Sequence, residues 1–301
     1  MFEFPGNDIP TSVFLINPNG DKTKLVSVDK SYKNDNYNLG EEYTLILEWN
    51  HKINSMIYFF FDIHNLIEVD FSEFDASEVT SMGYLFYNCA NLKKIIFGNI
   101  NTSSLIEMAG IFYHCTSLSS IDLSYFNTSK VTNMENLFYE CSSLTSLNVT
   151  NFDTSKVTSM SQMFYNCILL TSLDITNFNT SQVQIMDYLF YRLESIKEID
   201  ISNLDTSKVI GLYYFFAGCK SLTSLHINLK APKAFSVIGF FYNCKSLISL
   251  NISEFDISSA EDMSYMFSGL KSLTSLDLSN LKFSKVKKMS YMFTESSSLI
   301  S

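Results

Sequence analysis

Six cysteines are the side chains with the widest chemical options in this 301-residue sequence, because thiols can form disulfides, bind zinc or act as nucleophiles. Four of them end a Phe-Tyr-x-Cys motif at intervals of 26 residues: Cys89, Cys115, Cys141 and Cys167. If such positions stack in register, neighbouring Cβ atoms lie about 4.8 Å apart, beyond the roughly 3.8 Å of a disulfide. A metal site is also disfavoured, because stacked ligands would fall in a line. We therefore expect a buried column of free thiols, with no metal and no cofactor.

The same spacing produces an outward-facing column of mainly acidic and amide side chains. Carboxylates about 4.8 Å apart in water repel by about 0.9 kcal/mol, so the column could recruit Ca²⁺ or a basic partner. The alternative is that these groups bond neighbouring Ser and Thr residues and keep an exposed sheet soluble. Ile96 interrupts the column. As a binding surface, this strand-face column consists of Asp70, Asp122, Asn148, Asp174, Asp200, His226, Asn251 and Asp277.

A second column of Asp and Asn follows an inward-facing Phe, or its equivalent, at the end of each predicted strand. Side chains of this kind accept hydrogen bonds from the backbone of a turn, so we expect a capping role more than binding. This turn column consists of Asp75, Asn101, Asn127, Asp153, Asn179, Asp205 and Asp256.

The Asn-x-Ser/Thr pattern of N-glycosylation occurs in both of these columns. It arises easily in repeats rich in Asn, Ser and Thr, so chance is a serious alternative. The candidate glycosylation sites are Asn101, Asn127, Asn148, Asn179 and Asn251.

Tyrosines form a third column, between an inward-facing Phe and the Cys position. If the rings are exposed, they offer a long stripe for stacking on sugars or for packing against another filament. If the rings lean inward, they only shield the core, and the sequence leaves both alternatives open. This aromatic column consists of Tyr87, Tyr113, Tyr139, Tyr165, Tyr191 and Tyr242.

Catalytic chemistry has little support in the sequence. The four histidines belong to no repeated arrangement of acid, base and nucleophile, and no Gly-rich phosphate loop or HExxH motif is present. The net charge of -10, without a basic stripe, argues against a nucleic-acid partner. We therefore expect a protein that is not an enzyme.

These columns need a repeating scaffold to position them. The Cys position recurs as Leu193, Cys219, Cys244, Leu270 and Ser296, with one interval of 25 residues, and it occurs earlier as Ile63. A fixed period of roughly 20 to 50 residues is typical of solenoids. The sequence therefore predicts a repeat solenoid, of the leucine-rich-repeat-type parallel β solenoid class, with about ten coils of 26 residues.

Each coil is expected to combine a strand with a folded return path. In the repeat 144–167, Leu144, Leu147 and Val149 point inward from a strand that forms a parallel sheet across repeats. The return path is expected to contain a short second strand over 157–160 and a helical or 3₁₀ turn over 160–165. One repeat, at 222–244, is irregular because it is one residue shorter than the others. A kink or bulge is expected near 230–234.

Two parts are expected along the chain. Residues 1–52 do not repeat and predict a small N-terminal β cap, with strands at 12–16, 24–28 and 43–49, the first two as a hairpin. Residues 53–301 form the repeat array, whose last repeat stops where the next strand should begin. We therefore expect further repeats in the natural protein. No signal peptide and no apolar run of about 18 residues that could span a membrane is visible.

The repeat units resemble a known family. The units at 117–141 and 143–167 follow the pattern LxxLDLSNFDTSKVTxMxxMFYNC and are similar to BspA-like leucine-rich-repeat surface proteins of bacteria and protists. The resemblance implies an extracellular or cell-surface, non-enzymatic protein for adhesion or for recognition of a protein or glycan. The alternative is a structural protein that self-associates through the ends or sides of the solenoid into fibres or a surface layer.

Overall fold

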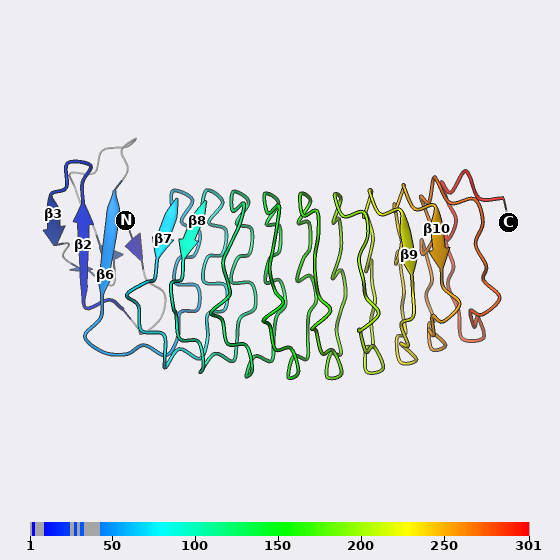
Figure 1. The fold of residues 1–301 in the computed structure, drawn as a ribbon, viewed down its shortest axis with the longest axis horizontal. Coiled ribbons are helices and arrows are strands. Elements are labelled where there is room, and N and C mark those ends of the chain that lie inside the picture. The colour runs from blue at the N-terminus through cyan, green and yellow to red at the C-terminus, as the bar shows by residue number, and fades with distance from the viewer. Residues whose placement is uncertain (1, 4–8, 25–26, 29–30, 33–42, 301) are drawn as a thin grey trace.

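In the computed structural model, the chain forms a row of stacked repeat units beside a small antiparallel sheet at its N-terminal end (Figure 1). The structure describes residues 2–3, 9–24, 27–28, 31–32 and 43–300. Within these residues there is no helix, and the strands are short and belong to open sheets. It follows that this part of the chain has no helix long and apolar enough to cross a membrane.

Antiparallel strands precede the repeats. β2 (Ser12–Ile16) pairs on one side with β3 (Lys22–Lys24) and on the other with β6 (Thr44–Glu48). The predicted hairpin is therefore present, and Gly20 N–H closes its turn on Asn17 O at 2.9 Å. A second sheet has the strand order β1-β5-β4, with bounds Phe2–Glu3, Ser31–Tyr32 and Ser27–Val28.

The single strand predicted over 24–28 is wrong. Lys24 ends β3, whereas Ser27 begins β4 in the other sheet, and residues 25–26 lie outside the described part of the chain. The prediction failed because β propensity shows that residues favour a strand but not which sheet the strand joins.

The N-terminal sheet contributes to the core of the first repeat. Val13 and Leu15 alternate inward along β2 and belong to the same buried cluster as the repeats. Trp49 packs on Phe59 and Phe74, with ring centroids 5.6 and 5.7 Å apart. The predicted packing of Trp49 on the first repeat is confirmed.

Successive repeats stack with equivalent positions in register. Parallel bridges join Ser55 to Ser81, Ser81 to Glu107, and Glu107 to Asn133, and the series continues to Lys288. The prediction that side chains 26 residues apart lie above one another is therefore confirmed, and so is the prediction of a repeat protein.

The return path of each repeat alternates two kinds of backbone hydrogen bond. Gln162 N–H donates to Asp187 O of the next repeat at 2.9 Å, whereas Met163 N–H donates to Met160 O of its own repeat at 3.2 Å. The same alternation recurs along the array, with acceptors 25 residues ahead, or 24 where the shorter repeat follows. Every second peptide group is therefore satisfied only by the neighbouring repeat.

This alternation makes the predicted helical or 3₁₀ turn over 160–165 wrong. A helix directs its N–H groups back along its own chain, but left-handed residues interrupt that path at Gln162 (φ 57°) and Asn166 (φ 61°). The second strand predicted over 157–160 is reduced to parallel bridges at Ser159. The return path is thus a series of turns bonded across repeats.

Short parallel strands lie on the opposite side of the stack. β7 (Glu68–Asp70) pairs with β8 (Lys94–Ile96), and β9 (Ser224–His226) pairs with β10 (Ser249–Asn251). Figure 1 shows the two pairs near opposite ends of the row. Their inward residues are apolar, as the leucine-rich pattern predicts.

The predicted continuous parallel sheet is wrong in the central repeats. There the contact is reduced to longer bonds, from Thr145 N–H to Ser119 O at 3.2 Å and from Thr171 N–H to Thr145 O at 3.5 Å. The threonine hydroxyls of Thr145 and Thr171 donate to the same carbonyls. Because the bonds on the return path are shorter, we infer that the return path sets the repeat spacing and that the strand side follows it.

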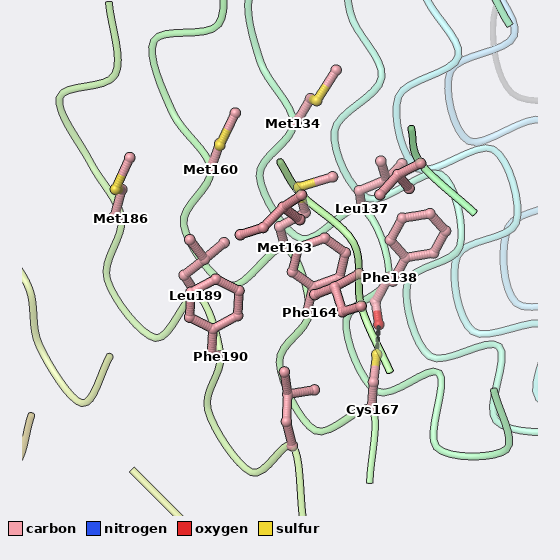
Figure 2. Close-up of a cluster of buried hydrophobic side chains, with 14 of the residues drawn as sticks. Met134, Leu137, Phe138, Met160, Met163, Phe164, Cys167, Met186, Leu189 and Phe190 are labelled. Atoms are coloured by element: carbon pink, nitrogen blue, oxygen red, sulfur yellow. Dashed lines mark hydrogen bonds between the residues drawn. The ribbon is translucent and has the colours of Figure 1, made fainter. Parts of the chain in front are cut away.

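Stacked side chains fill the interior of the row. Phe138, Phe164 and Phe190 are fully buried, with ring centroids 5.9 and 6.2 Å apart and nearly parallel planes. Figure 2 shows this phenylalanine column beside a column containing Met134, Met160 and Met186. Burying each such side chain contributes roughly 1.5–3 kcal/mol to the free energy of folding, so burial of the core strongly favours stacking of the repeats.

A buried threonine column ties neighbouring turns together. Thr154 Oγ1 donates to Asn179 O at 3.0 Å and accepts a hydrogen bond from Asn179 N–H at 2.8 Å. One hydroxyl thus satisfies both backbone groups of a residue in the next repeat. The column consists of Thr102, Thr128, Thr154, Thr180 and Thr206.

The shorter repeat breaks this column. Thr206 Oγ1 is buried and has no hydrogen-bond partner among the described residues. The backbone ahead of it turns instead toward the following repeat, with Lys230 bridged to Asp256 and Ala231 N–H donating to Asp256 O at 2.8 Å. Near 230–234, where the sequence predicts a kink or bulge, the structure has this extra bridge, and the main stack continues through Ser236.

The intact and broken threonines give a matched pair of mutations. Thr154→Val keeps the shape of the side chain but leaves two backbone groups of Asn179 without their partner, so we expect a loss of about 1–3 kcal/mol in the free energy of unfolding. Thr206→Val removes a buried hydroxyl that bonds nothing, so we expect no loss or a small gain. Denaturant titration of both variants measures the difference, and equal losses would contradict this account of the column.

Candidate functional site

The strand-face column is exposed along its whole length. Asp122 Oδ1 accepts a hydrogen bond from Ser124 N–H at 2.9 Å, and Asp174 Oδ1 accepts one from Thr176 N–H at 3.0 Å. Hydrogen bonds from the hydroxyl and the backbone N–H of Thr176 lower the pKa of the Asp174 carboxyl group, and bonds from the backbone N–H and the hydroxyl of Ser124 lower the pKa of Asp122. The same bond to the backbone two residues ahead is made by Asp70, Asn148, Asp200, Asn251 and Asp277.

The two carboxylate oxygens of each aspartate in the strand-face column therefore have different roles. One carboxylate oxygen caps the following turn, and the other remains available to solvent or to a partner. His226 departs from this pattern, because its Nδ1 lies 3.0 Å from Nδ2 of Asn251. The column is thus an ordered row of hydrogen-bonding groups whose positions are fixed by the backbone.

A shallow groove adjoins the last part of the strand-face column. It has a volume of about 310 Å³ and lies between β10 and the following repeat. Its polar members include Asn251 and Asp277, and one of its apolar members, Ile248, is 64% exposed. The lining residues are Ile248, Ser249, Leu250, Asn251, Ile252, Ser253, Ser275 and Asp277.

The turn column caps turns, as its sequence pattern indicates. Asp153 Oδ1 accepts a hydrogen bond from Ser155 N–H at 3.0 Å. Hydrogen bonds to Ser77 and to Lys52 lower the pKa of Asp75 to about 2. Equivalent bonds to the residue two positions ahead involve Asn101, Asn127, Asn179, Asp205 and Asp256.

The candidate glycosylation sites share this geometry. Asn101, Asn127, Asn148, Asn179 and Asn251 are all exposed, and the oxygen of each side-chain amide accepts a backbone hydrogen bond. The amide nitrogen is the atom that a glycan would modify. Use of these sites stays a prediction.

The aromatic column is partly buried and stacked. Its ring centroids are 4.7 Å apart between Tyr87 and Tyr113, 4.3 Å between Tyr113 and Tyr139, and 4.5 Å between Tyr139 and Tyr165. Another 4.5 Å step leads to Tyr191, after which Ala217 ends the stack. Because each inner ring has a neighbour on both faces, a sugar could contact its edge but could not stack on its face.

Tyr242 stands apart from that continuous stack. It makes edge contacts with Tyr214 and Tyr265, with ring centroids 6.1 Å away in both cases. These partners belong to a second aromatic row that the sequence analysis missed, at the position three residues before the aromatic column. Its members are Tyr58, Tyr84, Tyr188, Tyr214, Tyr265 and Tyr291.

Glycine makes room for this second row. Tyr84 lies across Gly110, where an added Cβ would come within 2.3 Å of the tyrosine ring. Tyr214 lies across Gly239 in the same way, at 2.4 Å. The signal in the sequence was the alternation of Tyr with Gly, Asn and Gln at one position, all of which adopt positive φ.

The cysteine column is buried and free of disulfides, so that prediction is confirmed. The thiols belong to Cys89, Cys115, Cys141, Cys167, Cys219 and Cys244. Each thiol donates to the carbonyl of a phenylalanine in the preceding repeat, as Cys167 does to Phe138 O at 3.1 Å (Figure 2). Burial raises the pKa of five of them, to about 12 for Cys89, and so keeps these five thiols protonated and unreactive: Cys89, Cys115, Cys141, Cys167 and Cys219.

The histidines lie in different surroundings. His114 Nδ1 and Glu140 Oε2 are 2.6 Å apart, whereas His64 Nε2 lies 3.4 Å from Asp62. His51 contacts Asn50, and His226 contacts Asn251. No group of three or more His, Cys, Asp or Glu side chains in the described residues is arranged to hold a metal ion.

Two partly buried carboxylates were not singled out from the sequence. Glu107 Oε1 accepts a hydrogen bond from Ala109 N–H, and Asp187 Oδ1 accepts one from Tyr213 N–H, at 2.8 and 2.9 Å. Burial raises the pKa of both groups. Asp187 fits there because Gly211 lies beneath it, where an added Cβ would be 2.8 Å from the carboxylate.

Asp187 gives a pH-dependent prediction. Its pKa is raised on folding, so the folded state disfavours the ionised carboxylate and stability falls as pH rises above about 3.9. Asp187→Asn keeps the oxygen that bonds Tyr213 and removes the charge. We expect a gain at pH 7 of less than about 1 kcal/mol, discounted for partial exposure, and no gain near pH 3.

Asp174→Asn is the matched control, since the pKa of Asp174 is lowered by its bonds to Thr176. Its effect at pH 7 should have the opposite sign and should also vanish in acid. Denaturation midpoints at the two pH values test both variants. A stabilising Asp187→Asn effect that persists unchanged in acid would show that charge is not its cause.

The repeat region matches one protein family. The model described as "Mycoplasma protein of unknown function, DUF285" matches residues 54–167, 143–249 and 229–301. These three successive matches extend from the first repeat through the last and cover more than half of the chain. Comparisons with curated proteins and with solved structures found no match.

Proposed function

The chain belongs to the DUF285 family of Mycoplasma proteins of unknown function, and we propose that it is a BspA-like surface protein that works in adhesion or recognition. In this proposal the stacked repeats are a leucine-rich-repeat-type parallel β solenoid, and the N-terminal sheet is its cap. The in-register bridges and the single shared core support the solenoid. Trp49 and the buried residues of β2 support the cap.

The observation that carries the functional proposal is the strand-face column. Its side chains are exposed, are held in fixed positions by the backbone and recur once per repeat. A partner lying along the row would meet many similar shallow contacts, whose effects combine through multivalency. We propose that this partner is a protein or a glycan outside the cell.

The surrounding surface suits such a partner. The residues beside the column are mainly Ser and Thr, such as Ser146, Ser172 and Thr171, and they are exposed. Their hydroxyls can both donate and accept hydrogen bonds. The adjoining groove adds one exposed apolar side chain, Ile248. This composition favours binding without catalysis, because the polar groups repeat along the face and do not form one unique constellation.

Binding to arrays of immobilised glycans and immobilised extracellular proteins tests the proposal. The test variant combines Asp122→Asn, Asp174→Asn and Asp200→Asn, which removes three charges and keeps each oxygen that caps a turn. The control variant combines Asp153→Asn and Asp205→Asn in the turn column. We expect saturable binding by the natural chain, about tenfold or more weaker for the test variant and unchanged for the control.

Two results would contradict this proposal. One is the absence of saturable binding on either array, and the other is equal weakening by both variants. Electron microscopy of the same material distinguishes the alternative function. Separate rods agree with recognition, whereas regular fibres or layers formed by the purified chain would favour self-assembly.

A further inference from the structure

Five tyrosines of the aromatic column form one continuous ladder, which we define as Tyr87, Tyr113, Tyr139, Tyr165 and Tyr191. Successive ring centroids are 4.3–4.7 Å apart, and successive ring planes are inclined by 3–15°. Each ring comes from a different repeat. The ladder therefore places phenols that are 26 residues apart in the sequence in direct contact.

Other tyrosine pairs provide an internal comparison. Parallel pairs outside the ladder are wider, with centroids 5.2 Å apart for Tyr58 and Tyr84 and 5.4 Å apart for Tyr188 and Tyr214. A third parallel pair, Tyr265 with Tyr291, is 5.1 Å apart, and the remaining contacts between two tyrosines are edge-to-face or tilted, at 5.7 Å or more. Among the tyrosine pairs of the described residues, the ladder thus has the shortest spacing and the most regular stacking.

The ladder is open to solvent along one side. All five rings are partly exposed. Both faces of the inner rings are covered by their neighbours, so the exposed part must be the ring edge. An electron can leave such a ring without the stack opening, and the exposed edge leaves space for a ring to pivot toward its neighbour.

The thiols and the central methionines of the array are better protected than the ladder. The six thiols are buried and hydrogen-bonded to backbone carbonyls. Met134, Met160 and Met186 are fully buried as well. These thiols and methionines are therefore poor competitors of the tyrosine ladder for an oxidant.

We propose that the tyrosine ladder is a site of oxidative cross-linking, at which hydrogen peroxide and a haem peroxidase join neighbouring repeats through dityrosine. Peroxide takes one electron and one proton from each of two phenols and becomes two water molecules. The two phenoxyl radicals then form a carbon–carbon bond between ring positions ortho to the oxygens. The hydrogen on each bonded carbon moves to the oxygen as a proton, so both phenols are restored.

The fold favours this product over cross-links between molecules. Stacking holds the two reacting rings together before oxidation, and such pre-positioning raises the effective concentration far above that of a second chain in solution. The result is a covalent link that closes a loop of one repeat and reinforces contacts otherwise made by hydrogen bonds and packing. The chemistry depends on the ladder and holds whatever the chain binds.

The test treats the purified full-length chain with peroxide and a haem peroxidase. We expect dityrosine fluorescence from monomers, a mass loss of two hydrogens per cross-link, and a yield independent of protein concentration. Peptide mapping should find Tyr113 joined to Tyr139 and Tyr139 joined to Tyr165. These products should exceed those of the Tyr58–Tyr84 and Tyr188–Tyr214 pairs by on the order of tenfold.

Two variants make the test specific. Tyr139→Phe keeps a ring in the stack but removes its phenol, so it should abolish both central cross-links. It should retain the cross-links between Tyr87 and Tyr113 and between Tyr165 and Tyr191. Tyr125→Phe is the control, because Tyr125 is 57% exposed and lies outside the ladder. It should leave the yield within monomers unchanged. Unfolding curves before oxidation verify that both variants fold.

Three outcomes would overturn the proposal. The first is dityrosine found only between chains, with a yield that rises with protein concentration. The second is dityrosine in monomers that peptide mapping assigns to tyrosines outside the ladder. The third is the absence of dityrosine while peroxide oxidises exposed methionines such as Met289, which is 52% exposed and reports that the oxidant was active.

Discussion

The fold depends on backbone hydrogen bonds that each repeat cannot make alone. On the return path, every second N–H donates to a carbonyl in the next repeat, with typical distances of 2.7–3.1 Å. Buried peptide groups must find partners, so this pattern commits each repeat to a neighbour. The left-handed residues that create it recur four positions apart, as at Gln162 and Asn166. Columns of like side chains are the direct consequence, because the bonds keep equivalent positions in register.

Each of these columns has a different structural role. Phe164 and Cys167 lie within a buried interior, Thr154 ties the backbone of neighbouring repeats, and Asp122 and Asp174 cap turns at an exposed face. An exposed side chain that caps a turn, such as Asp122, therefore also recurs at a fixed position on the surface. This coupling supports a recognition surface built from many weak contacts, since the scaffold orders the contacts before a partner arrives. Where the shorter repeat interrupts the register, the hydroxyl of Thr206 has no hydrogen-bond partner among the described residues.

The sequence predicted what depends on periodicity. The stacking, the free thiols and the capping role of Asp153 follow from the period of 26 residues and from simple spacing arguments. The predicted turn over 160–165 failed because an apolar pattern cannot distinguish a helical turn from left-handed turns bonded to a neighbour. The continuous sheet failed because side-chain alternation does not report hydrogen-bond length, which reaches 3.5 Å at Thr171. The second tyrosine row was missed because Gly110 and Gly239, which make room for it, look like departures from the repeat.

Distances between spin labels test the central claim most directly. Ser120, Ser224 and Ser275 are exposed equivalents on different repeats, and each can be replaced by cysteine for labelling while the native thiols stay buried. Ser224 is four repeats from Ser120, and Ser275 is six. If repeats stack in register, the Ser120–Ser275 distance should exceed the Ser120–Ser224 distance by about 10 Å, or roughly 4.8 Å per repeat. Distances that do not increase with the number of intervening repeats would contradict the stacked arrangement and the columns that depend on it.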